Sequence, residues 1–154
     1  MKTVLATLLL GAVFAAPAAS ERGSTGALVK VAYNAKLKRS ILVDARGFSL
    51  YVFFFDPRDR AICVGSLPIP NCQRNWPPLL TTGKPRAGAG ARAALLGTTR
   101  RSDGRLQVTY NHRALYFFHG FAPTPPDRKP GDVNGQDLGS HWWVLSPAGV
   151  PIKP

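Results

Sequence analysis

The chain has 154 residues, 45% of them hydrophobic and 18% charged, which fits one globular domain and excludes a disordered, collagenous or coiled-coil protein. Its 15 glycines and 14 prolines favour turns and argue against an all-helical bundle. Lys and Arg number 20 against 8 Asp and Glu, a net charge of +12, so anionic partners are favoured.

Residues 1–20 are typical of a secretory signal peptide. Lys2 precedes an apolar run, Val4 to Ala16, and small residues with Pro17 follow. The run is shorter than the roughly 20 residues that span a bilayer, and no later segment approaches that length. We expect cleavage after Ala18 or Ser20, no transmembrane segment in the mature chain, and a periplasmic or extracellular location. Losing Lys2 leaves 19 basic against 8 acidic residues, a net charge of +11.

Cys63 and Cys72 are the only cysteines. In an oxidising compartment a disulfide is expected, closing the loop Val64 to Asn71 with its two prolines. Eight residues intervene, so the spacing does not fit a C-x-x-C redox or metal motif.

Residues 41–55 predict a β-hairpin in which Gly47 provides the turn. Side chains alternate along the second strand, and both of its faces are apolar. One face carries Leu50, Val52 and Phe54, and the other carries Tyr51, Phe53 and Phe55. This pattern predicts a central strand between two layers.

The same pattern, V-x6-L-Y-x-F, returns 65 residues later and indicates an internal repeat. The two copies contain Val43, Leu50, Tyr51 and Phe53, then Val108, Leu115, Tyr116 and Phe118. A third hairpin is predicted over 141–152 with its turn at 146–149, and a short helix could start at 93–96. Residues 83–92 and 122–139 are expected to be long Pro- and Gly-rich loops.

These features predict one mainly β domain over 21–154 with little helix. Antiparallel hairpins from repeat 1, about 41–80, and repeat 2, about 96–152, would form a small sandwich or a covered sheet.

Several short segments, taken in order, resemble a bacterial family of secreted repeats of unknown function, predicted lipoproteins with a Y-x-(F/W/Y)-x-x-D motif. The segments include Tyr51 to Asp56, the cysteine pair with Trp76 to Leu79, Leu96 to Thr98, Arg101 to Gly104, Val108 to Tyr116, Pro130 to Gln136 and Trp143 to Pro147. The resemblance covers nearly all of residues 41–152 and implies a β fold without implying a reaction. Tyr51, Phe53 and Asp56 match its motif, and Tyr116 and Phe118 match in the second copy.

The chain departs from the family pattern at four points. It has no cysteine for lipid attachment near the cleavage point, and its cysteine pair is more widely spaced. Phe121 stands where the second copy of the motif would have its aspartate, and Arg113 stands at the histidine position of the family.

Tyr51 and Asp56 lie five positions apart, so in a continuous strand their side chains would point to opposite faces. They are therefore not expected to form a paired phenol and acid. We expect the Asp56 carboxylate to accept hydrogen bonds from the turn at Arg58 to Arg60, and the Tyr51 hydroxyl to find a partner at the edge of the core.

Three histidines, His112, His119 and His141, are the candidate ligands for a transition metal, provided that the fold brings them together. A second candidate is a calcium site in the oxygen-rich loop that contains Asp132, Asn134 and Gln136. However, this loop lacks the glycine and the acidic residue at the positions where a calcium loop needs them. An Asx-type turn is the preferred interpretation of this loop.

The chain shows no nucleophile elbow, phosphate loop or dinucleotide fingerprint, so we expect no enzyme and no cofactor. The basic residues are spread along the chain and carry no DNA-recognition motif, which favours anionic envelope lipid or glycan over specific nucleic acid. The sequence thus predicts an exported, non-catalytic binding or envelope-structural module. The alternative is a periplasmic metal-binding or redox accessory protein that uses the histidines.

Overall fold

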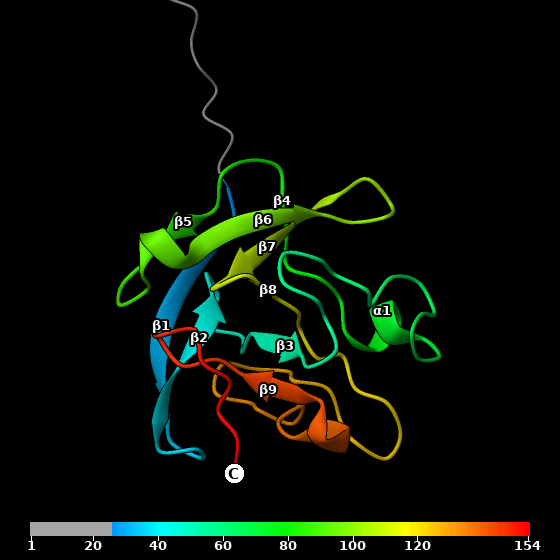
Figure 1. Cartoon of the computed structure of the whole chain (residues 1–154). Helices are drawn as coiled ribbons and strands as arrows, with labels where there is room; N and C mark the ends of the chain where they lie inside the picture. The colour runs from blue at the N-terminus through cyan, green and yellow to red at the C-terminus, as the bar shows by residue number, and fades with distance from the viewer. Residues whose placement is uncertain (1–25) are drawn as a thin grey trace, which may run out of the picture.

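Short strands and hairpins make up most of the fold, which we describe from a computed structural model over residues 26–154 (Figure 1). The signal peptide expected over 1–20 lies outside the described residues. The prediction of a mainly antiparallel β fold with little helix is confirmed. Within the described residues, helical structure is limited to α1 (Cys72–Asn75) and two single 3-10 turns, η1 (Ala93–Leu95) and η2 (Leu138–Ser140). None of these helices is long and apolar enough to cross a membrane.

The first sheet contains a hairpin that the sequence analysis did not predict. Strands β1 (Leu28–Asn34) and β2 (Arg39–Asp44) pair antiparallel along their length, and β5 (Arg86–Ala87) adds to β1 in parallel. The Asn34 side chain closes the turn by accepting a hydrogen bond from the Leu37 amide.

The hairpin expected over 41–55 turns where predicted, but its second strand has another partner. Asp44 accepts hydrogen bonds from the amides of Arg46 and Phe48, and Gly47 takes a φ of 94°, a conformation that glycine adopts without strain. Beyond this turn the chain stays paired with β2 as far as Leu50, whose amide donates to the Leu42 carbonyl, and β3 (Tyr51–Phe53) then pairs antiparallel with β9 (Trp142–Val144). Strand β9 belongs to the third predicted hairpin, which the structure contains.

The third sheet has the order β4–β7–β6, and β8 pairs with the last two residues of β7 (Figure 1). Its strands are β4 (Leu80–Thr81), β6 (Leu96–Arg100), β7 (Leu106–Tyr110) and β8 (Arg113–Ala114). Asn111 and His112 both have positive φ and form the two-residue turn between β7 and β8.

Strand β3 separates two hydrophobic clusters, as the apolar character of both its faces predicts. Tyr51 and Phe53 enter one cluster, and Leu50 and Val52 enter the other. The strand ends at Phe53, however, so the alternation does not continue. Phe54 and Phe55, expected on the two faces, are instead about half exposed.

Candidate functional site

The two copies of the repeat meet at their tyrosines. The Tyr51 amide donates to the Tyr116 carbonyl and the Tyr116 amide donates to the Tyr51 carbonyl, both at 2.9 Å. This reciprocal pair places both phenol rings in the buried core, where each has less than 1% of its surface exposed to solvent.

Each tyrosine hydroxyl then donates to an aspartate of the other copy. Tyr116 reaches Asp56 Oδ2 at 2.8 Å, and Tyr51 reaches Asp127 Oδ2 at 2.7 Å. The second oxygen of each carboxylate accepts from a backbone amide further along its own loop, Ile62 for Asp56 at 2.9 Å and Asn134 for Asp127 at 2.8 Å.

Asp127 is therefore the structural counterpart of Asp56, and the assignment of Phe121 to the aspartate position needs correction. The backbone agrees, since the amides of Asp56 and Asp127 bond the carbonyls of Phe53 and Phe118, both at 3.2 Å. Asp127 comes six positions after Phe121 because the loop of the second copy is longer. The turn at Arg58 to Arg60 does not provide the amide that binds Asp56, because Ile62 does.

Burial dominates the electrostatics of both pairs. It raises the pKa of Asp56 from 3.8 to about 6, although the Ile62 amide and the Tyr116 hydroxyl act in the opposite direction. Burial also raises the pKa of Asp127 and of both tyrosines.

Between the pairs, the indoles of Trp76 and Trp142 stack with ring centroids 3.8 Å apart, and each contacts the tyrosine of its own repeat edge-on. The motif thus forms a buried joint between the copies.

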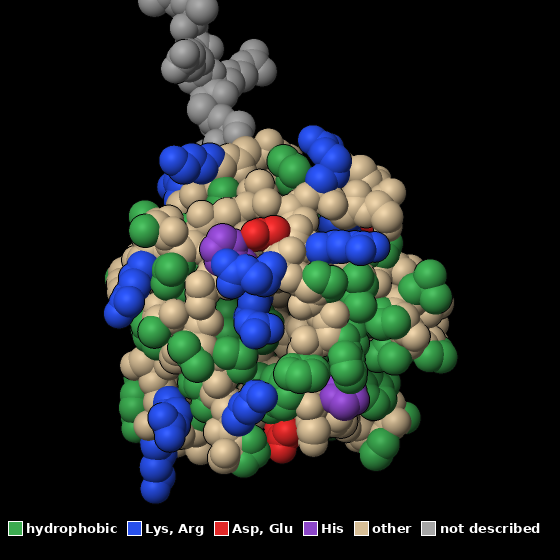
Figure 2. All heavy atoms as spheres, in the orientation of Figure 1, with side chains coloured by type: hydrophobic (Ala, Val, Ile, Leu, Met, Phe, Trp, Pro, Cys, Tyr) green, Lys and Arg blue, Asp and Glu red, His purple; other side chains and the backbone are tan. Residues whose placement is uncertain are grey.

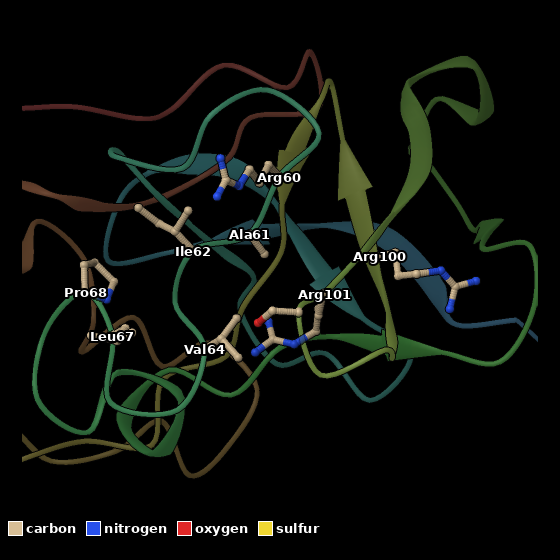
Figure 3. Close-up of a pocket in the computed structure, with 9 residues that line it drawn as sticks. Arg60, Ala61, Ile62, Val64, Leu67, Pro68, Arg100 and Arg101 are labelled. Carbon is tan, nitrogen blue, oxygen red and sulfur yellow. The ribbon is translucent and has the colours of Figure 1, made fainter.

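An open groove of about 640 Å³ lies beside this joint, between the disulfide loop and the end of β6 (Figure 3). Its lining combines apolar and cationic side chains: Arg60, Ala61, Ile62, Val64, Leu67, Pro68, Arg100, Arg101 and Ser102. In Figure 3, Arg101 points toward Val64 while its neighbour Arg100 points the opposite way.

Arg101 is the buried cation of the groove. Its guanidinium donates to the Cys63 carbonyl at 3.0 Å, to Gln73 Oε1 at 2.7 Å, to Asp103 at 3.3 Å and to Gln107 Oε1. It thereby ties the disulfide loop to the third sheet. Its burial was not expected from the sequence, where Arg101 only begins a segment that resembles the family.

The predicted Cys63–Cys72 disulfide is present. It closes a loop whose tip exposes two large apolar side chains, Leu67 and Ile69. The exposure of these two residues was also not expected from the sequence.

The structure does not bring the three histidines together. No group of three or more His, Cys, Asp or Glu side chains within residues 26–154 is arranged to hold a metal ion. His112 Nδ1 lies 2.7 Å from Asp59 Oδ2, His119 is exposed, and the His141 ring packs edge-on against Phe55.

The oxygen-rich loop holds itself together. Asp132 Oδ2 accepts from the amides of Arg128 and Lys129, and the Asn134 side chain donates to the Pro126 carbonyl. Gln136 connects the loop to the third hairpin, donating to the Ile152 carbonyl and accepting from the Val144 amide. These polar side chains thus satisfy backbone groups.

Comparison with known proteins supports the family resemblance. The model of a family described as a secreted repeat of unknown function matches residues 97–146, from β6 to the end of β9 and the start of its turn. This stretch contains Tyr116 and Asp127, the second copy of the motif. No curated protein and no solved structure matches the chain.

Proposed function

We propose that this chain is an exported, non-catalytic binding module that attaches to anionic material of the cell envelope. The observation that carries this proposal is that acidic and basic side chains have different environments in the fold. Among residues 26–154, every acidic side chain has a hydrogen-bonding or ionic partner within the fold, whereas every Lys and Arg except Arg101 is at least partly exposed to solvent.

Seven acidic residues, all Asp, lie in this part of the chain. Four are buried: Asp44, Asp56, Asp127 and Asp132. The three others, although exposed, each contact a neighbour: Asp59 pairs with His112, Asp103 with Arg105, and Asp137 with the Trp143 indole. Four of the seven carboxylates are thus withdrawn from the surface, and the cations outnumber the three that remain exposed.

The basic residues have the opposite distribution. Of the 18 Lys and Arg in the described residues, only Arg101 is buried. Figure 2 shows Lys and Arg spread over one face, with isolated acidic side chains between them. Such a distribution attracts polyanions over a distance set by screening, about 8 Å at physiological ionic strength.

The family description of a secreted repeat supports a location outside the cytoplasm, where anionic lipids and cell-wall polymers are the available polyanions. The test is binding of the mature, oxidised protein to phosphatidylglycerol vesicles and to an anionic polysaccharide, with phosphatidylcholine vesicles and a neutral polysaccharide as controls. We expect binding to both anionic probes that falls steeply as salt rises. Absence of binding to either at low salt, or salt-insensitive binding to a neutral probe, would contradict the proposal.

A further inference from the structure

The tip of the disulfide loop presents apolar side chains to solvent. Leu67 is 70% exposed and Ile69 is 39% exposed, and each is followed by a proline. Water solvates such side chains poorly, so an apolar phase that receives them lowers their free energy.

The loop is held in one shape. Besides the disulfide, Val64 and Leu67 exchange two backbone hydrogen bonds of 3.1 Å, and the Gln73 amide donates to the Gly65 carbonyl at 2.9 Å. Arg101 holds the Cys63 carbonyl at the base of the loop. A preorganised loop inserts its tip without the entropic cost of ordering itself.

Two cations flank the loop. Arg60 lines the groove behind it, and the exposed Arg74 lies on α1, which directly follows it. No acidic residue occurs in the sequence from Arg60 to Ser102. Apolar insertion combined with adjacent positive charge is what binds a peripheral protein to an anionic bilayer.

We propose that this loop docks on a bilayer of anionic phospholipid, with Leu67 and Ile69 inserted among the lipids and with Arg60 and Arg74 near their phosphates. This inference rests on the proposed function and names its partner. A soluble polyanion would contact the same arginines, but it offers no apolar phase for Leu67.

The experiment compares neutral substitutions that leave the net charge unchanged. Leu67→Ser/Ile69→Ser removes the apolar tip, and Val150→Ser, at a 57% exposed position in the turn of the third hairpin, is the matched control. For phosphatidylglycerol vesicles we expect the double variant to bind at least tenfold more weakly and the control to bind like the parent. Binding of an anionic polysaccharide should be the same in all three.

A second pair of variants tests the arginines at equal net charge. Arg60→Gln/Arg74→Gln should weaken vesicle binding more than Arg39→Gln/Lys129→Gln, because the first pair flanks the loop and the second pair lies elsewhere on the surface. Melting curves confirm that each variant is folded.

Direct contact is measured with Leu67→Trp, whose indole should be quenched by brominated phospholipid in anionic vesicles. Equal vesicle binding by the parent and Leu67→Ser/Ile69→Ser, or an unquenched indole at position 67, would overturn the loop proposal while leaving the electrostatic function intact. If the parent binds neither vesicles nor polysaccharide, both proposals are wrong.

Discussion

The buried Asp56 carboxyl should make the stability of this protein depend on pH. Its pKa is raised from 3.8 to about 6 in the folded state, mainly by burial. The folded protein therefore keeps a proton that the unfolded chain has already released between about pH 4 and pH 6. The contribution of Asp56 to the free energy of unfolding therefore falls as pH rises through this range. At about 1.4 kcal/mol for each unit of pKa difference, this carboxyl accounts for a loss of about 3 kcal/mol.

Asp56→Asn isolates this contribution, because the amide has a similar shape and does not titrate. Urea unfolding of the parent and the variant at pH 4 and at pH 7 gives four free energies. We expect the stability of the parent relative to the variant to decrease by about 2.4 kcal/mol between the two pH values. Asp127, whose pKa is also raised, is present in both proteins and cancels from the difference.

A further variant sharpens the test. Tyr116→Phe removes a donor that lowers the Asp56 pKa, so it should extend the loss of stability to higher pH. Parallel pH profiles for the parent and Asp56→Asn, within about 0.5 kcal/mol, would refute the assignment of Asp56 as a costly buried carboxylate.

Four other outcomes are expected. Cys63→Ser/Cys72→Ser should lose on the order of 2 kcal/mol or more in urea unfolding, and alkylation without prior reduction should label neither cysteine of the parent. Tyr51→Phe strands the Asp127 carboxylate and should cost about 2 kcal/mol, so an unchanged melting temperature would show that the pair contributes nothing. Arg101→Met leaves the acceptors of a buried guanidinium unpaired and should cost about 3 kcal/mol or more, whereas Arg100→Met should be nearly neutral. Mass spectrometry of exported protein should find a new N-terminus between Ala19 and Glu21, and an intact Met1 would contradict signal cleavage.

Local chemistry made part of the fold predictable. The turn at Gly47 and the apolar alternation of Leu50 to Phe53 depend on neighbours in sequence, and the structure contains both. The pattern could not show where β3 ends, because Phe54 and Phe55 are as apolar as the residues before them. Their exposure follows from the chain leaving β9 after Phe53, which is a tertiary event.

The candidate site was harder to predict because it depends on contacts between distant segments. A fixed offset of 65 residues assigns Phe121 to the aspartate position of the motif. An insertion displaces the true counterpart, Asp127, further along the chain. The signal that could have found Asp127 is the Pro-Pro-Asp sequence at 125–127, because an aspartate after a rigid segment is well suited to a fixed buried position. Arg101 begins a segment that resembles the family, but no local pattern indicated its burial, since its acceptors come from residues 63, 73, 103 and 107.

The two hydrogen bonds from the tyrosine of one repeat to the aspartate of the other set the smallest chain that can fold. Each repeat supplies the hydroxyl that the other repeat's buried carboxylate needs, so neither half can satisfy its own core. A chain cut in the exposed loop near Ala89 would yield two fragments, each with a buried acid in need of a donor. Those fragments should regain structure only when mixed, which makes the full pair of repeats, and not the single repeat, the minimal folding unit.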